Sequence, residues 1–153
     1  MSARLHEPSG LVVAARPLSA GAGLAMGLLF LRVASSALLF AVHGYPKLLD
    51  MGGELARIED PFGLGAHFSL LAALGAEVVC PPFLMLGLFT RVACLPVLVV
   101  LAVAMGVVHR EWSLAEGQFG WLLLICFISI ALCGPGQLSL DTWLESRHGE
   151  NRG

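Results

Sequence analysis

The chain has 153 residues, of which 57% are hydrophobic and only 13% are charged. Soluble domains are usually about 45–50% apolar and about 25% charged, so this composition excludes intrinsic disorder and argues against a water-soluble globule. A mean hydropathy of +0.81 points the same way. The net charge of -2 provides no basic surface, so no nucleic-acid partner is expected.

The apolar segments predict an all-α integral membrane protein, a four-helix bundle forming a single transmembrane domain over residues 1–153. Each crossing needs roughly 20 apolar residues, and backbone groups in lipid must bond internally, which favours packed helices. The expected spans are residues 23–44, 68–89, 92–108 and 119–133, and the expected tails are residues 1–20 and 137–153. No small-residue cleavage pattern follows the first span, so it is interpreted as a retained membrane helix.

Prolines and short polar breaks mark the ends of these spans. Pro46, shortly after Gly44, is expected to end the first helix. Pro81 and Pro82 lie inside the second span and are expected to kink it. Only the dipeptide Thr90-Arg91 separates the second span from the third, which predicts a tight antiparallel pair. A short helix around residues 54–58 is expected at the membrane interface.

Four spans place both termini on one side of the membrane. The tails and the turn after the second span hold Arg4, Arg16, Arg91, Arg147 and Arg152. The two opposite loops hold Lys47, Arg57 and Arg110. Because basic residues favour the cytoplasmic side, we expect both termini in the cytoplasm and a multi-pass protein of the cell inner membrane.

Two charged residues lie deep within the expected spans. Such residues usually face the interior of a bundle, because an unpaired charge in mid-bilayer costs several kcal/mol. Arg32 is eleven residues before His43, or about 16 Å, and Glu77 is ten residues after His67, or about 15 Å. If both histidines lie at the outer face, the two charges share one depth. The sequence therefore predicts an Arg32–Glu77 ion pair, either as a structural clasp or in a functional role.

A polar stripe runs along the first span. Helical spacing places Arg32, Ser36 and His43 on one face, with Lys47 near it, and such a stripe can line a ligand cavity. His109 closes the third span at the same membrane face. Two imidazoles at one level suit a quinone carbonyl, proton transfer or haem ligation, and each histidine alone also suits simple contact with interfacial water. Haem is the weakest of these interpretations because the spacing carries no known specificity.

Several kinds of site are absent from the sequence. The four cysteines form no C-x-x-C pair and lie in apolar runs, so we expect core residues, with no metal site and no disulfide. There is no phosphate-binding glycine loop, no G-x-S-x-G and no H-E-x-x-H. Any redox chemistry would therefore need a bound cofactor or a partner protein.

Six short motifs follow one another along residues 24–141. They are G-L-L-F-L-R at 27–32, H-G-x-x-K at 43–47, Glu77, G-L-F-T-R-V-A at 87–93, His109 and G-P-G-Q-L-S-L-D at 134–141. In this order they resemble the motifs of the DoxX family of small four-helix membrane proteins. The chain departs from the family pattern where Cys80-Pro81-Pro82 replaces two small glycines. It also departs at the start of the fourth helix, where the family often has an acidic residue and the nearest candidates here are Gln118 and Glu116.

The resemblance implies membrane-associated redox work, since members are similar to subunits that pass electrons from thiosulfate to quinone. We therefore expect an integral membrane subunit of a quinone-linked oxidoreductase, with quinone bound in a polar cavity of the bundle. The residues expected to form that site are Arg32, Ser36, His43, Lys47, Glu77 and His109. In this interpretation His43 or His109 would bond a carbonyl and carry its proton, and Glu77 would relay protons.

Two other functions are compatible with the sequence. The protein can be a non-catalytic membrane anchor or assembly subunit for a soluble redox enzyme, with the Thr90-Arg91 turn and the region of Asp141 as the docking face. It can also be a small-molecule carrier, although no internal repeat of the transporter kind is visible. The expected partners are membrane lipid and a soluble or membrane redox subunit, and a homo-oligomer stays open.

Overall fold

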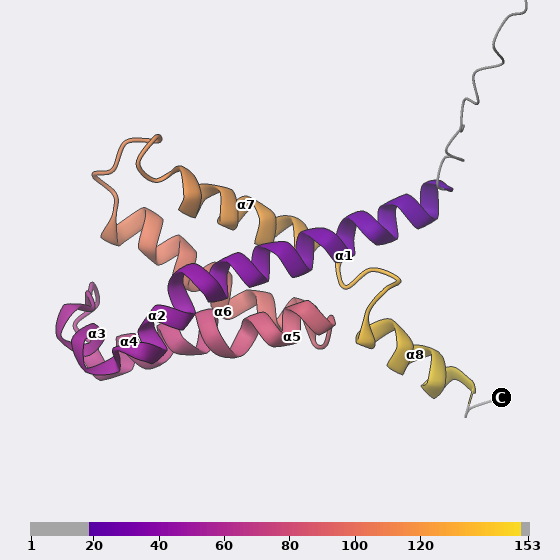
Figure 1. Cartoon of the computed structure of the whole chain (residues 1–153), viewed down its shortest axis with the longest axis horizontal. Helices are drawn as coiled ribbons and strands as arrows, with labels where there is room; N and C mark the ends of the chain where they lie inside the picture. Colours follow the sequence, from indigo (N-terminus) through magenta and orange to yellow (C-terminus); the bar gives the residue numbers. More distant parts are fainter. Residues whose placement is uncertain (1–18, 151–153) are drawn as a thin grey trace, which may run out of the picture.

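The computed structural model describes residues 19–150, which form helices joined by short loops (Figure 1). Residues 1–18 and 151–153 lie outside the described part of the chain, so most of the expected N-terminal tail lies there too, including Arg4 and Arg16, as does Arg152 at the other end. Three helices are long and apolar enough to cross a membrane, and a fourth apolar helix is shorter.

The sequence predicted that the first long helix ends at Pro46. This prediction was wrong, because the helix continues past Pro46. Helix α1 (Ala20–Leu39), the π segment η1 (Phe40–Gly44) and α2 (Tyr45–Leu49) run on as one apolar helix of 30 residues. A proline clashes with the carbonyl four residues before it and cannot donate to it. Val42, which carries that carbonyl for Pro46, lies within η1, so the wider π turn lets the helix continue past the proline.

The second long helix repeats this arrangement. A short helix α3 (Met51–Arg57) confirms the expected interfacial helix and leads into α4 (Ala66–Leu74), η2 (Gly75–Val79) and α5 (Cys80–Leu86). The π segment ends just before Cys80, and Pro81 and Pro82 lie in the first turn of α5. The helical hydrogen bonding changes beside these prolines, and the kink expected from them stays a prediction.

A tight turn joins the second and third long helices, as predicted. Gly87 (φ 68°) and Phe89 (φ 48°) adopt left-handed backbone conformations there. The third helix consists of α6 (Thr90–Val103) and η3 (Ala104–Val108). Helix α7 (Gln118–Cys133) has 16 residues and is therefore about 24 Å long, short of a hydrocarbon core of about 30 Å.

Helix α8 (Leu140–Glu150) occupies most of the described part of the expected C-terminal tail. Figure 1 shows α8 and the start of α1 at the same end of the bundle, with α2 and α3 at the opposite end. The first helix of the described chain therefore begins, and the last helix ends, at the same end of the bundle (Figure 1).

The core lies where α1, α5, α6 and α7 pack together. Its fully buried apolar residues include Leu39, Leu84, Val97, Phe127 and Ile130. The outer faces of the same helices carry large exposed apolar side chains such as Phe30 and Leu132. In a membrane protein such faces contact lipid tails, which are as apolar as the side chains.

Candidate functional site

A cavity of about 650 Å³ lies at the α2–α3 end of the bundle. Its size falls within the roughly 300–1,000 Å³ that is usual for small-molecule sites. Its walls are mainly apolar and include Leu39, Phe62, Phe68, Val99, Met105 and Trp112. Four of the six residues predicted from the sequence also line it, namely His43, Lys47, Glu77 and His109. The first long helix, η2 and the loop after η3 thus bring these four together.

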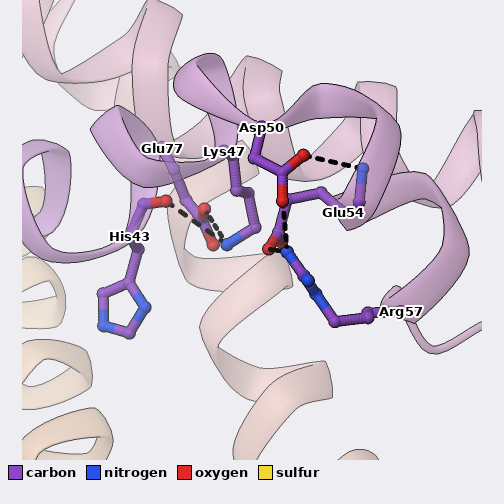
Figure 2. A network of polar contacts seen from close by, with 7 residues as sticks. His43, Lys47, Asp50, Glu54, Arg57 and Glu77 are labelled. Carbon is purple, nitrogen blue, oxygen red and sulfur yellow. Dashed lines mark hydrogen bonds and ion pairs between the residues drawn. The ribbon is translucent and has the colours of Figure 1, made fainter.

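An ion pair anchors the polar side of this cavity. Lys47 Nζ lies 2.7 Å from Glu77 Oε2, and the two side chains are only 17% and 10% exposed (Figure 2). Lys47 Nζ also donates to the His43 carbonyl oxygen at 3.4 Å. Each charge therefore compensates the other in a largely dry setting, where an unpaired charge would be costly.

Close packing of two π segments positions Glu77. Gly44 is buried against η2, and a Cβ at position 44 would overlap the Glu77 carbonyl oxygen. Pro81 and Pro82 stand four and five residues after Glu77, so neither can donate a backbone N–H to that carbonyl. The carbonyl faces the glycine instead, at a distance that only a residue without a side chain allows. The contact with Gly44 thereby sets the position of Glu77 along the first helix, opposite Gly44.

Aromatic rings hold both histidines. The His43 imidazole stacks on Phe119, with ring centroids 5.7 Å apart and an interplanar angle of 27°. The His109 imidazole stacks on Trp112 at 3.8 Å and 13°. In Figure 2 the His43 ring extends away from the Lys47–Glu77 pair. Stacking fixes the ring planes and leaves the ring edges, which carry the nitrogens, for a ligand.

A second charged network near the cavity differs in its exposure. Arg57 Nη2 lies 2.9 Å from Asp50 Oδ2 and 3.0 Å from Glu54 Oε1 (Figure 2). Asp50 also caps α3, since its Oδ1 accepts from the Gly53 amide at 3.0 Å. The Arg57 and Asp50 side chains are exposed, so these pairs contribute little to stability. We assign them to the local fold of α3.

The loop between α3 and α4, which Asp60 closes by hydrogen bonds, lines the part of the cavity farthest from α8 (Figure 1). The Asp60 carboxylate accepts from the Gly65 amide at 2.7 Å, from the Leu64 amide at 3.0 Å and from Ser69 Oγ at 3.2 Å. The Gly65 bond is the main reason why the pKa of Asp60 lies below its ordinary value. This closure holds Phe62, on the same loop, in the cavity wall.

The structure contradicts the predicted Arg32–Glu77 ion pair. Arg32 is 2% exposed, and its guanidinium donates to the carbonyl oxygens of Pro135 and Leu138, the latter at 2.8 Å. The prediction was wrong because it placed His43 and His67 at one level. The contact of Gly44 with Glu77 shows instead that Glu77 is level with the His43 end of the first helix. Arg32 therefore lies about three turns away, toward the other end of the bundle.

Arg32 belongs to a clasp between the C-terminal segment and the turn before α6. In this clasp, the Asp141 carboxylate accepts from the Phe89 amide at 2.7 Å and from the Thr90 amide and hydroxyl, both at 3.0 Å. The Asp141 amide donates to the Gly87 carbonyl at 2.9 Å. Burial raises the pKa of Asp141, but the hydrogen bonds from Thr90 and Phe89 and the nearby Arg32 lower it, and the net shift is downward.

Neither Arg32 nor Ser36 lines the cavity. Ser36 is fully buried and its hydroxyl has no hydrogen-bond partner within the described residues. Fully buried apolar side chains, including Leu84, Val97 and Phe127, occupy the core between the clasp and the cavity. The polar stripe predicted along the first helix is thus divided in two by an apolar layer.

No group of three His, Cys, Asp or Glu residues between positions 19 and 150 could hold a metal ion. The four cysteines, which all fall within this range, are free.

The chain matches a known family of proteins and a named relative. Residues 27–110 match the DoxX family model. The chain belongs to the DoxX family. It is 31% identical over 134 residues to the inner membrane protein YphA of Escherichia coli (strain K12), covering 79% of this chain and 92% of that protein. No solved structure matches the chain. The resemblance drawn from the motifs is confirmed, and this DoxX protein is an integral protein of the inner membrane.

Sequence reasoning missed several residues of the DoxX protein's cavity. Phe119 coincides with the start of an expected span, and the sequence predicted no site role for Trp112, although its position three residues after His109 was a usable signal. The Asp60 loop gave a weaker signal in the sequence, an acidic residue followed by Gly63 and Gly65. Both glycines adopt positive φ in the structure. Stacking and loop closure depend on contacts that the spacing of polar residues does not reveal.

Proposed function

We propose that this DoxX protein is the integral membrane subunit of a quinone-linked oxidoreductase and binds a quinone head group in the cavity. One observation carries the proposal: an apolar cavity of suitable volume collects His43, Lys47, Glu77 and His109 from separate segments of the chain. A functional cavity usually combines apolar walls with a few convergent polar groups.

The chemistry of the cavity fits a quinone ring. The ring is flat and apolar and carries two carbonyl acceptors on opposite edges. His43 and His109 come from different helices and present ring edges that can donate to such acceptors. A bound quinone supplies reversible uptake of two electrons and two protons.

In this proposal the two histidines contact the ligand, and Lys47 and Glu77 compensate each other's charge. An imidazole carries two ring nitrogens, one of which donates and one of which accepts in the neutral form, so His43 and His109 could each donate to or accept from a bound ring. The ammonium of Lys47 keeps Glu77 compensated inside the bundle. Glu116 lies exposed on the rim of the cavity, where it can exchange protons between the histidines and water.

We extend the proposal to membrane topology. Helix α7 packs against α1 and α6 and would make a fourth crossing where the bilayer adapts to its length. Arg91 and Arg147 lie at the end that carries α8, which we assign to the cytoplasm because of their positive charge. The cavity then faces the outer side of the inner membrane. Electrons would come from a soluble or membrane-bound redox partner.

A bound-ligand measurement tests the proposal. The protein is purified in mild detergent, its absorption spectrum is recorded, and it is extracted for quinone and haem. We expect about one quinone per chain, because a cavity of this volume holds one head group, and a clear loss in His43→Ala and His109→Ala. His67→Ala is the matched control, because His67 is exposed on α4 and does not line the cavity.

Other outcomes would overturn the proposal. Quinone that stays bound in both cavity variants would place the ligand elsewhere, and a haem spectrum would make the histidines candidate ligands. An empty protein with a redox enzyme attached would favour the anchor function, with Arg91 near the docking face. Solute flux in proteoliposomes would favour the carrier.

A further inference from the structure

The wall of the cavity between the second and third long helices is open toward the membrane. These helices pack closely near their connecting turn, where α5 contacts α6, but α4 contacts α6 much less. Figure 1 shows α4 and the end of the third helix diverging away from the turn. The cavity lies in this divergence, since both α4 and the α6–η3 helix line it.

Three residues that line the cavity at this edge are apolar and exposed. Phe68 and Ala72 on α4 and Val99 on α6 line the cavity, yet Phe68 is 57% and Val99 is 61% exposed. All three lie within helices that are long and apolar enough to span the membrane. In a bilayer, the exposed apolar surface at this edge would contact lipid tails, and the cavity would open to the bilayer there.

Three of the four polar residues of the cavity lie on other segments. His43 and Lys47 belong to the first helix and Glu77 to η2, while His109 directly follows η3. The loop held by Asp60 contributes Phe62 to the cavity wall. A ligand that matches this arrangement has a polar head at one end and a hydrocarbon chain at the other.

We propose that the opening between α4 and the α6–η3 helix is a lateral portal, through which a quinone with a hydrocarbon tail enters from the bilayer. The inference rests on the proposed function and adds the class of substrate to it: a lipid-soluble, tailed quinone. When the head is bound near His43 and His109, the tail lies between Ala72 and Val99 and continues into lipid. The source of the ligand is the membrane and not the aqueous phase.

The hydrocarbon tail of the quinone increases the supply of quinone to the cavity more than it increases the affinity of the cavity for quinone. Lipid tails are as apolar as the portal, so moving the tail from bilayer to portal gives little hydrophobic free energy. Partition of the tailed molecule into the membrane instead raises its concentration at the opening. An obstacle in the portal should consequently exclude the tailed quinone far more than a tail-less ring.

The first test places a bulky side chain in the portal. Ala72→Trp and the matched control Leu71→Trp are compared with the wild type for binding of decyl-benzoquinone and of the same ring without the decyl chain. Leu71 is 67% exposed and does not line the cavity. Because all three proteins share one detergent, partition into micelles cancels when the ratio of the two affinities is compared between proteins. A clash of about 1–3 kcal/mol predicts a fall of about 5- to 150-fold in this ratio for Ala72→Trp. Leu71→Trp should keep the wild-type ratio.

The second test uses the wild-type chain and does not depend on any variant folding. Decyl-benzoquinone with a photoreactive diazirine in its tail is crosslinked with and without excess tail-less quinone. Because tails in the lipid phase label every exposed face, only labelling that the tail-less ring suppresses reports the site. We expect suppressed labelling on residues 68–72 and 99–103.

The outcomes separate the two proposals. A wild-type affinity ratio in Ala72→Trp, or suppressed labelling only on other helices, would overturn the portal and leave the quinone site in place. If the tail-less ring suppresses no labelling and neither quinone binds the wild type, both the portal and the proposed function are overturned.

Discussion

Replacing Gly44 with alanine tests whether the contact between η1 and η2 sets the geometry of the cavity. A Cβ at position 44 would overlap the backbone oxygen of Glu77 and lie 3.1 Å from Val78 Cγ2. A side chain can rotate away from such a contact, but the backbone of a packed helix cannot. The two helices must therefore separate where Glu77 is positioned.

The expected magnitude follows from two opposing effects. Overpacking a close-packed interior typically costs about 1–3 kcal/mol. Alanine in place of glycine within a helix returns roughly 0.5–1 kcal/mol. The net loss for Gly44→Ala is then about 0–2.5 kcal/mol. At about 2–4 °C per kcal/mol for a chain of this size, the Tm should fall by up to about 10 °C relative to the wild type.

Thermal unfolding in detergent, followed by tryptophan fluorescence, measures this change. Gly27→Ala is the matched control, because Gly27 lies in α1 and a Cβ there meets nothing within 4 Å. The control should unfold at the wild-type temperature or above it. A Gly44→Ala variant as stable as Gly27→Ala would refute the reasoning, and so would unchanged quinone binding in a clearly destabilised Gly44→Ala protein.

Three further variants test the ion pair and the clasp by the same unfolding assay. Lys47→Met should lower the free energy of unfolding by about 3–5 kcal/mol, because it leaves the buried Glu77 charge unpaired. The double variant with Glu77→Gln should regain most of the lost stability. A double variant no more stable than Lys47→Met alone would contradict the pairing. Arg32→Lys should lose about 1.5–3 kcal/mol, since an ammonium cannot reproduce the fork that reaches two carbonyls; wild-type stability would argue against the clasp. Asp141→Asn should cost about 0.5–2 kcal/mol, as for other caps. Because the folded pKa of Asp141 is lowered, its contribution is present above the unfolded pKa and is lost as pH falls through the folded pKa, so the stability gap between wild type and Asp141→Asn should close below about pH 4. A gap that persists at low pH would count against the carboxylate as its cause.

The sequence predicted most of the helices, and four of the six residues that it proposed for a site line the cavity. His43 and Lys47 are one turn apart on one helix, so simple periodicity places them together, and the depth of Glu77 already indicated an inward-facing charge. The path of the helix beyond Pro46 could not be predicted, because the π segment that allows it depends on packing against the second helix.

The partner of Arg32 escaped prediction for a different reason. Its acceptors are backbone carbonyls of Pro135 and Leu138, more than a hundred residues away, and any residue type carries such a carbonyl. Only the motif at 134–141, which stood out by resemblance alone, indicated that this segment mattered. A side-chain pattern finds charges that need partners, but it cannot find partners in the main chain.

The apolar layer between the cavity and the clasp also bears on how the protein can take part in energy conversion. Leu84, Val97 and Phe127 in that layer are almost fully shielded from solvent, and the buried polar groups beside them on the first helix are the hydroxyls of Ser35 and Ser36. Packed hydrocarbon does not conduct protons without a chain of polar groups or water. If the cavity is the quinone site proposed above, its protons would therefore be exchanged with the aqueous phase on one side only, and its rate would not respond to the membrane potential through proton movement in this subunit.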